Sequence, residues 1–344
     1  MKRFLISRFA LVSIAGLVVL GGCSNPADTT ANNATPGDST AAAPKLTLAE
    51  PSQPADSVPG APAKKPYVIG VSLLTQDDEF YRALKKGLED QAKKQNVTVD
   101  IVSGDKDRNK QADQVTNFIA KKVDAIVLCP VDSSAIVGAV MAANTAKIPV
   151  FTADIASKCG TIVSHVASNN VEGGRLAGEY AAELLNGKGK IAILDLKTVT
   201  SVQDRVKGFK AAIAKYPGIT IVADIDVPEA KREEAVTKAT NLLTTQPDLN
   251  LIFGINDNVA LGTLSALKQA NKPDVIVIGF DAGPEAQTYI SSGTSPLKAD
   301  AIQFPHLIGV STIDTVIKSL NGEKVPAIIA VPTGIVKKDS FQKA

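Results

Sequence analysis

The chain has 344 residues, a length that allows two or three domains. Its 37 Lys and Arg residues nearly balance its 35 Asp and Glu residues, and aromatic residues make up only 4% of the chain, with no Trp. This composition excludes a strong electrostatic field for nucleic acid and leaves few platforms on which bases could stack, so no nucleic-acid partner is expected. Hydrophobic residues at 44% are typical of an α/β protein with a substantial core.

Residues 1–22 have the pattern of an export signal. Three basic residues precede an uncharged apolar run over residues 9–20, which is too short for a comfortable transmembrane helix. The run ends in the letters LGGC at Cys23, which resemble a bacterial lipobox and imply lipidation of Cys23; the alternative is an ordinary signal peptide with an incidental cysteine. Several acyl chains on one residue would anchor the protein to a membrane. We therefore expect an extracytoplasmic lipoprotein, either periplasmic or on the cell surface.

Residues 23–66 are rich in Pro, Ala, Thr, Ser and Asp and lack apolar periodicity. Such a segment cannot bury enough apolar surface to offset its ordering entropy. We expect a disordered tether between the lipid anchor and a folded body, acting as a passive spacer rather than as a partner-binding segment.

Strands and helices alternate from residue 67 onward. Strands are predicted at residues 67–74, 97–103, 125–128, 149–153, 161–167, 190–196, 219–225, 249–255, 275–280, 297–302, 327–331 and 334–336. Helices are predicted at residues 79–95, 109–121, 133–147, 171–186, 201–216, 229–245, 259–269 and 304–321. This alternation predicts an α/β fold with two doubly wound parallel-sheet lobes.

Polar residues follow two of the most apolar strands. Asn256-Asp257-Asn258 come directly after the run at residues 249–255, and Asp281 follows the run at residues 275–280. Ligands of open α/β sheets bind outside the carboxyl ends of the strands, so Asn256 and Asp281 are predicted ligand contacts. The alternative is structural: Asp257 and Asn258 would cap the next helix, and Asp281 would open a turn.

Six segments resemble the periplasmic ribose-binding-protein family, the type I periplasmic sugar-binding proteins of ABC importers. They read IGVSLLTQDDEFYRALKKG, IPVFTADI, IVSHVASNNVEGGRLAGEYAA, SVQDRVKGFKAA, NLLTTQPDLNLIFGINDNVALGTLSAL and VIVIGFDAGPEA, and the resemblance covers residues 67–338. It implies two lobes joined by a three-strand hinge. The implied N-terminal lobe comprises residues 66–168 plus 304–332, and the C-terminal lobe residues 169–303 plus 333–344.

The resemblance also implies a ligand site in the cleft between the lobes. Polar side chains would recognise hydroxyl pairs there, and aromatic faces would pack on a sugar ring. The implied ligand-binding residues are Asp78, Phe80, Tyr81, Asp154, Arg205, Asn256, Asp281 and Gln303. Two alternatives stay open: Phe80 and Tyr81 could form a hydrophobic staple at a helix start, and Arg205 could be an exposed helix charge.

Four positions depart from the family pattern. Ile155 stands where the family has Arg, Ala230 falls near an aromatic position, and Asp78 and Cys129 replace Asn residues. Cys129, Ile155 and Ala230 are therefore candidate cleft-lining residues. Loss of a cationic donor and gain of a carboxylate argue against ribose, because a buried carboxylate needs donors. We expect a polyhydroxylated ligand richer in donors, such as an amino-sugar, a nucleoside or another cationic solute.

The remaining patterns support neither catalysis nor a cofactor. With two His residues and no suitably spaced Cys, neither a metal site nor a Ser-His-acid site is predicted. The acidic turn at residues 105–109 lacks the Gly and Glu of a calcium loop and is interpreted as a helix-capping turn. Cys129 and Cys159 follow strands expected to be neighbours, which leaves a disulfide open; two buried free thiols are the favoured alternative.

The leading interpretation is a binding protein that is not an enzyme and acts as a monomer. An open form would capture a small sugar or sugar-like ligand, hinge closure would trap it, and the closed form would deliver it to an ABC permease in the membrane. The alternative is a sensor whose closed form engages a chemoreceptor or a receptor kinase.

Overall fold

The computed structural model describes residues 45–47 and 62–342. The predicted signal peptide at residues 1–22, the predicted lipidation site Cys23 and most of the predicted tether lie outside the described residues. Among the helices of the described ranges, none is both long enough and apolar enough to cross a membrane.

The described residues form two six-stranded sheets. The first contains β1 (Val68–Leu73), β2 (Thr98–Ser103), β3 (Ala125–Leu128), β4 (Val150–Ala153), β5 (Ser164–Ser168) and β11 (Ile328–Val331). The second contains β6 (Lys188–Asp195), β7 (Gly218–Asp226), β8 (Leu251–Gly254), β9 (Ile276–Asp281), β10 (Leu297–Ile302) and β12 (Gly334–Lys337). Their orders are β11-β5-β4-β3-β1-β2 and β12-β10-β9-β8-β6-β7, and every pairing is parallel except the antiparallel pair β10–β12.

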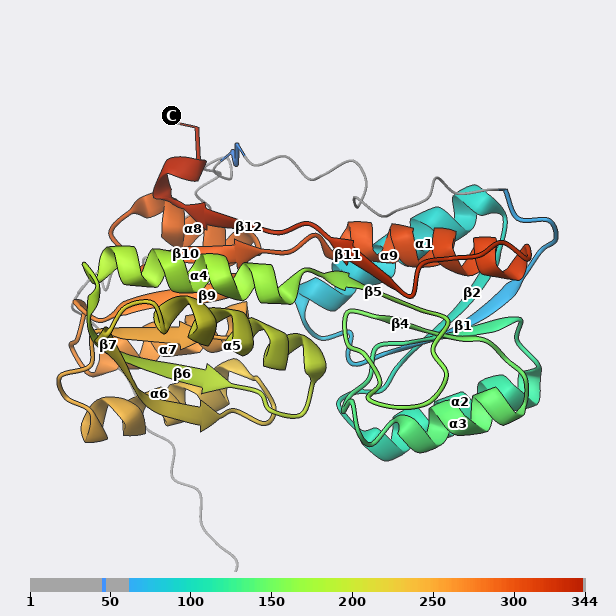
Figure 1. Cartoon of the computed structure of the whole chain (residues 1–344), viewed down its shortest axis with the longest axis horizontal. Coiled ribbons are helices and arrows are strands. Elements are labelled where there is room, and N and C mark those ends of the chain that lie inside the picture. The colour runs from blue at the N-terminus through green and yellow to red at the C-terminus, as the bar shows by residue number, and fades with distance from the viewer. Residues whose placement is uncertain (1–44, 48–61, 343–344) are drawn as a thin grey trace, which may run out of the picture. The chain divides into compact units, whose positions relative to one another are not determined.

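Helices cover both faces of each sheet (Figure 1). They are α1 (Glu79–Gln95), α2 (Arg108–Lys121), α3 (Val137–Thr145), α4 (Asn170–Leu184), α5 (Thr200–Ile213), α6 (Arg232–Thr245), α7 (Asp257–Gln269), α8 (Pro284–Ser292) and α9 (Pro305–Leu320), with a 3₁₀ turn at Lys338–Ser340. On the first sheet α1 packs with α9 and α2 with α3; on the second, α4 packs with α5 and α6 with α7. Strands β3 and β8 are buried along their whole length, which explains their continuous apolar runs. The predicted α/β fold with two doubly wound lobes is confirmed.

The chain passes from one sheet to the other three times, after β5, after β10 and after β11. Hydrogen bonds hold these crossings together. The backbone N–H of Asn169 donates to the carbonyl oxygen of Val331 (2.9 Å), and the hydroxyl of Thr333 donates to the carbonyl oxygen of Ile302 (2.6 Å). Three short parallel connections permit hinge bending while limiting other movements. The residue boundaries of the two lobes stay a prediction.

Side-chain caps explain where two of the helices begin. Asp107 accepts hydrogen bonds from the backbone N–H groups of Asn109 and Lys110 (2.8 and 3.1 Å), so the acidic turn is a helix cap as predicted. Helix α7 is capped by Asn256, whose Oδ1 accepts from the backbone N–H of Val259 (2.9 Å). The alternative in which residues 257 and 258 cap this helix is therefore wrong, because α7 already includes both of them.

Two helices differ from the sequence predictions. Helix α8 is not predicted, because only Ala286 and Ile290 of its nine residues are buried and its apolar face is too narrow to stand out. Helix α3 begins later than the predicted residue 133. There Oδ1 of Asp132 accepts from the backbone N–H groups of Ser134 and Ala135 (2.7 and 2.9 Å) and forms a separate turn.

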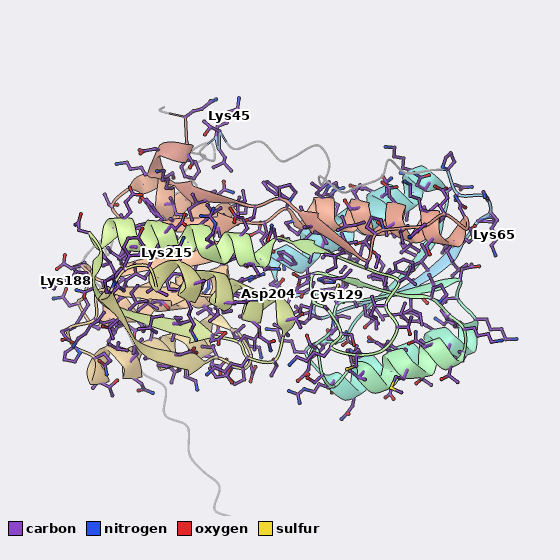
Figure 2. The ribbon with its side chains drawn as sticks, in the orientation of Figure 1. Lys45, Lys65, Cys129, Lys188, Asp204 and Lys215 are labelled. Atoms are coloured by element: carbon purple, nitrogen blue, oxygen red, sulfur yellow. The ribbon has the colours of Figure 1, made fainter. Side chains whose placement is uncertain are left out.

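Parts of the predicted tether contact the folded body. Leu46 pairs with Phe341 in an isolated antiparallel bridge, and the N–H of Gln342 donates to the carbonyl oxygen of Lys45 (3.0 Å). Further along, Lys65 donates to Asp124 Oδ1 (2.8 Å); Figure 2 labels Lys45 and Lys65. The expectation of a passive spacer up to residue 66 is therefore wrong at residues 45–47 and 62–66, where the chain bonds to neighbours.

Candidate ligand-binding site between the two sheets

A cavity of about 1290 Å³ lies at the carboxyl ends of strands from both sheets. Pockets for small ligands commonly measure about 300–1,000 Å³, so this cavity has room for a monosaccharide-sized molecule and opens to solvent. Of the residues singled out in the sequence, those that line it are Asp78, Phe80, Tyr81, Asp154, Ile155, Arg205, Ala230, Asn256, Asp281 and Gln303. The structure thus brings together side chains that are up to 225 residues apart (Asp78 and Gln303) in the chain.

The carboxylate of Asp154 follows β4 and is held by Tyr81. Asp154 is only 4% exposed, and its Oδ2 accepts a hydrogen bond from the Tyr81 hydroxyl (2.7 Å). Its backbone is left-handed (φ +63°), a conformation that a non-glycine residue rarely adopts and that is often found at functional sites. Burial raises the pKa of Asp154 to about 6, while the positive charge of Arg205 and the Tyr81 hydrogen bond act in the opposite direction.

Arg205 is a buried cation on the opposite side of the cavity, in α5. Its Nε donates to Asn170 Oδ1 (2.9 Å) and its Nη1 donates to the carbonyl oxygen of Ile255 (2.7 Å). The same Nη1 lies 3.6 Å from Asp281 Oδ1, and the guanidinium carbon lies 4.1 Å from the centre of the Phe280 ring. Because Arg205 is 5% exposed, the alternative of an exposed helix charge is wrong.

Asp281 ends β9 and is bound to the hinge residue Gln303. Its Oδ1 accepts from Gln303 Nε2 (2.7 Å), and its backbone is also in the positive-φ region (φ +109°). Burial raises the pKa of Asp281 to about 8, and the nearby Asp257 adds to this increase against the effect of Arg205. Asp281 therefore keeps a proton far more readily than an exposed carboxyl group does.

Two buried carboxyl groups lie behind Asp281, and sequence reasoning missed their role. Asp257 Oδ2 accepts from the backbone N–H of Gly283 (2.7 Å), and its own N–H lies 3.4 Å from Asp281 Oδ2. Asp300 is completely buried in β10 and its carboxyl group contacts that of Asp257. Burial, together with the negative charge of Asp257, raises the pKa of Asp300 well above its ordinary value. A signal for Asp300 exists in the sequence, since it is the one charged residue at the centre of the apolar run 299–302.

Some predicted ligand contacts also have a structural role. Asp78 Oδ1 accepts from the backbone N–H of Tyr81 (3.0 Å) and caps α1, while Asn256 caps α7. The rings of Phe80 and Tyr81 meet edge to face with centroids 5.2 Å apart. These bonds occupy one oxygen of Asp78 and the amide oxygen of Asn256, and they fix both side chains at the cavity wall.

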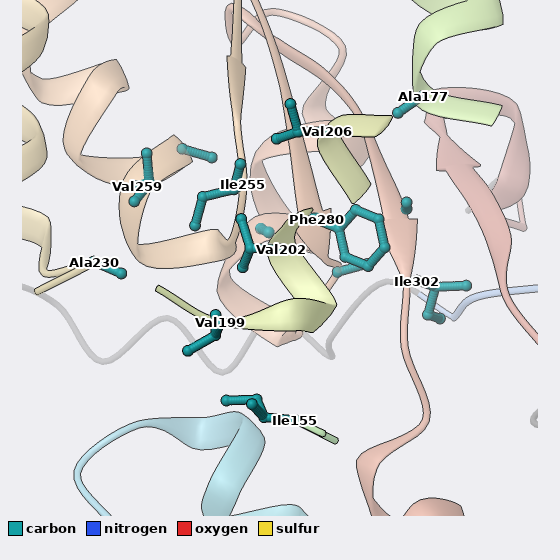
Figure 3. Close-up of a cluster of buried hydrophobic side chains, with 14 of the residues drawn as sticks. Ile155, Ala177, Val199, Val202, Val206, Ala230, Ile255, Val259, Phe280 and Ile302 are labelled. Atoms are coloured by element: carbon teal, nitrogen blue, oxygen red, sulfur yellow. The ribbon is translucent and has the colours of Figure 1, made fainter. Parts of the chain in front are cut away.

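Apolar side chains form part of the cavity wall where the family pattern has a cation and an aromatic ring. Ile155 and Ala230 are 3% and 6% exposed and belong to one apolar cluster with Val199 and Val202 (Figure 3). Cys129 differs from the expectation: it is fully buried and is not among the lining residues. It is a free thiol, as is Cys159, which is exposed rather than buried.

Direct hydrogen bonds join the two lobes at the rim of the cavity. The backbone N–H of Thr200 donates to Ser133 Oγ (3.1 Å), and Thr200 Oγ1 accepts from the N–H of Ala156 (3.0 Å). The ammonium group of Lys106 donates to the carbonyl oxygen of Glu229 (2.6 Å). The structure therefore shows the two lobes in direct contact beside the cavity.

Residues 69–324 match the family model described as "Periplasmic binding protein domain". The ribose import binding protein RbsB of Bacillus subtilis (strain 168) is 37% identical over 272 residues, which are 78% of this chain and 87% of that protein. The chain therefore belongs to the periplasmic binding protein family, and the resemblance to the type I sugar-binding proteins of ABC importers is confirmed.

Solved structures share the fold. An ABC transporter solute-binding protein from Actinobacillus succinogenes 130z with bound D-allose has a TM-score of 0.74 at 30% identity, over 80% of this chain and 99% of that one. The fructose-binding periplasmic domain of a hybrid two-component system has a TM-score of 0.75 at 27% identity, over 79% and 91% of the two chains.

Proposed function

We propose that this protein is the extracytoplasmic binding component of an ABC importer and captures a sugar or sugar-like solute. One observation carries the proposal: polar side chains from both sheets converge on a single cavity, with Asp154 on one side and Arg205 and Asp281 on the other. A ligand that bonds to both sides favours the closed form by the free energy of the contacts that it makes only there.

The cavity favours a small polyhydroxylated ligand, either a sugar, an amino-sugar or a nucleoside-like molecule. Carboxylates and a guanidinium group recognise hydroxyl pairs by paired hydrogen bonds, and the Phe80 ring offers an apolar face at the wall. One relative is named a ribose import binding protein, and one similar solved structure is titled as having D-allose bound. Ribose itself is disfavoured here, because Ile155 supplies no donor beside Asp154 and adds an apolar contact instead.

Delivery to a permease and attachment by a lipid at Cys23 complete this proposal. The sequence up to Cys23 supports the anchor, and the composition of residues 24–44, rich in Pro, Ala, Thr and Asp, supports a tether. In this role the protein acts as a monomer without catalytic activity, and the closed lobes present the surface that docks on the permease.

A sensor is the second candidate function. It is favoured by one observation, the structural likeness to the fructose-binding periplasmic domain of a hybrid two-component system. In that role the same closed form would engage a chemoreceptor or a receptor kinase rather than a permease.

Calorimetric titration with a panel of pentoses, hexoses, polyols, amino-sugars and nucleosides tests the capture role. The proposal expects at least one tight one-to-one binder, and binding that is weakened in an Arg205→Met variant. Uptake of the labelled binder by a deletion strain then separates the two roles, since loss of uptake supports import and intact uptake supports sensing. A protein that binds no member of the panel contradicts the proposal.

A further inference from the structure

Three buried acceptor atoms on residues that line the cavity have no hydrogen-bond partner among the described residues: Asp154 Oδ1, Gln303 Oε1 and Asp257 Oδ1. Asp154 and Gln303 are 4% and 5% exposed. A buried acceptor without a donor costs free energy, so a ligand that donates a hydrogen bond to one of these atoms is favoured. The cavity therefore favours a ligand with more donors than acceptors at the Asp154 side.

The surroundings of Asp154 leave its negative charge incompletely balanced. The groups that face it are Tyr81 and Asp78 at the start of α1, Cys129 after β3, and Arg205 in α5. Only Arg205 is a cation, and its bonds go to Asn170, to a backbone carbonyl and to Asp281 rather than to Asp154. Ile155, the next residue in the chain, contributes no charge.

Two features of Asp154, one contact of its side chain and its backbone conformation, fix the orientation of its carboxylate group. The Tyr81 hydroxyl fixes Oδ2 at 2.7 Å, and the left-handed backbone fixes the direction in which the side chain leaves the strand end. Oδ1 is a buried atom that has no hydrogen-bond partner among the described residues, on a residue that lines the cavity. An ammonium group has three donors and no acceptor, whereas a hydroxyl group brings an acceptor as well.

We propose that Asp154 forms a subsite for an ammonium group, so that the preferred ligand is an amine-bearing sugar or cyclitol rather than a neutral sugar. This inference rests on the proposed function, because it assigns the chemical class of the ligand captured in the same cavity. The ammonium group donates to Asp154 Oδ1, and the hydroxyl groups of the ligand occupy the side formed by Arg205, Asp281 and Gln303.

The test is calorimetric titration at pH 7.5 with matched sets: D-glucose, D-glucosamine and N-acetyl-D-glucosamine; the three galactose counterparts; and D-ribose with 3-amino-3-deoxy-D-ribose. Acetylation keeps the nitrogen but removes the charge. We expect at least one amine to bind about tenfold or more tightly than its neutral and acetylated counterparts, since charge-assisted hydrogen bonds are about twice as strong as neutral ones.

Two variants locate the charge. Asp154→Asn keeps an acceptor for Tyr81 but removes the charge, and we expect it to weaken binding of the amine more than binding of the neutral sugar, so that the preference for the amine is lost. Asp77→Asn removes the same charge from an exposed residue at the cavity mouth and should keep the preference. Circular dichroism and thermal unfolding check that both variants fold, and the wild-type comparison of matched sugars needs no variant.

Each other outcome overturns a defined part of the account. Neutral sugars that bind as tightly as their amines overturn the ammonium subsite and leave the proposed function in place. An Asp154→Asn variant that weakens neutral and amine ligands equally overturns the subsite as well, because Asp154 then serves a hydroxyl group. If no sugar of either kind binds, the proposed function and this inference both fail.

Discussion

Arg205 Nη1 and Asp281 Oδ1 lie 3.6 Å apart in a buried wall of the cavity, and the two side chains form an ion pair when Asp281 is ionised. Asp257 and Asp300 lie nearby. Among the described residues, the Arg205 guanidinium group is therefore the cation that offsets the charge of several neighbouring carboxyl groups. Removing one partner of such a pair leaves the other charge buried and uncompensated. The stability of this wall and its affinity for ligand therefore depend on the same side chain.

Replacing Arg205 by Met is expected to lower the free energy of unfolding at pH 9, where Asp281 is ionised, by about 3–5 kcal/mol, the usual cost of breaking a buried ion pair. Ligand affinity should fall at least about tenfold, since a buried charged contact is lost as well. Urea unfolding and calorimetric titration measure the two effects. Lys207→Met is the matched control, because it removes an exposed cation from the same helix. An Arg205→Met variant as stable as the wild type would contradict the account.

The stability of the ligand-free protein should fall as the pH rises from 7 to 9. The pKa of Asp281 is about 8 in the folded protein, against 3.8 for an ordinary Asp. The folded state therefore holds more protons than the unfolded chain over this range, and the proton is lost as the pH passes 8. The pKa of His165 is lowered to about 4, so its effect on stability lies at lower pH.

For one such proton the loss is about 1.4 kcal/mol between pH 7 and 9, since it amounts to one pKa unit over this range. Urea unfolding at pH 7, 8 and 9 measures it. Asp281→Asn should show a flatter dependence on pH, because that side chain no longer titrates. An equal slope in the wild type and the variant would show that Asp281 is ionised throughout.

For the residues of the candidate site, the sequence predicted which positions line the cavity but not which side chains contact one another. Asn256 and Asp281 could be identified because each interrupts an apolar strand, and the resemblance added Asp154, Arg205 and Gln303. The bond from Tyr81 to Asp154 and the contact of Asp257 with Asp300 join residues 43 to 73 positions apart. Only the packing of the helices on the sheets brings such residues together, so no local pattern reveals the bonds.

Helices α4 and α5 approach each other closely through glycines, and this packing positions Arg205. A β-carbon on Gly174 would lie 1.9 Å from the carbonyl oxygen of Arg205, and one on Gly208 would lie 2.0 Å from that of Val171. Both distances are far below van der Waals contact, and both neighbours are backbone atoms that cannot rotate away. A larger residue at either position must separate the two helices.

Gly174→Ala is therefore expected to lower the free energy of unfolding by about 1–3 kcal/mol, as overpacking usually does, and to weaken ligand binding through Arg205. Gly138→Ala is the control, because a β-carbon there meets nothing within 4 Å and Ala favours a helix by about 0.5–1 kcal/mol over Gly. Thermal unfolding and calorimetric titration distinguish the two variants. Equal stability changes at both glycines would contradict the packing argument.

At the scale of elements the sequence predicted most strands and helices, because buried strands gave continuous apolar runs and amphipathic helices gave a clear period. The helix α8 escaped prediction for the opposite reason, since it buries only two side chains. The bonds of residues 45–47 and 62–66 to the body also escaped, because single hydrogen bonds in a Pro-rich stretch leave no periodic signal.

At the scale of the whole described body, direct hydrogen bonds between the two lobes stabilise the closed form in addition to the contacts that a ligand makes. Ser133 and Thr200 join the lobes without any ligand atom, as do Ala156 and Thr200. Each such bond contributes about 0.5–1.5 kcal/mol at most, so together they shift the balance between open and closed forms without fixing it. The sequence could predict two lobes and a hinge, but these contacts depend on how the lobes meet.

Replacing Ser133 by Ala together with Thr200 by Val should shift the ligand-free protein toward the open form. Ligand affinity should fall by about three- to tenfold, because the ligand must then supply more of the closing free energy. Small-angle scattering of the ligand-free protein should give a larger radius of gyration for the variant, and titration gives the affinity. Unchanged affinity and unchanged scattering would show that the lobes close without these bonds.

The central claim is that one small ligand bonds to both lobes at once. A crystal structure of the protein with its tightest binder tests this claim most directly. The account predicts density for the ligand between the two sheets, within hydrogen-bond distance of Asp154 on one side and of Arg205 or Asp281 on the other. A ligand that touches only one lobe, or that binds outside this cavity, would contradict the account.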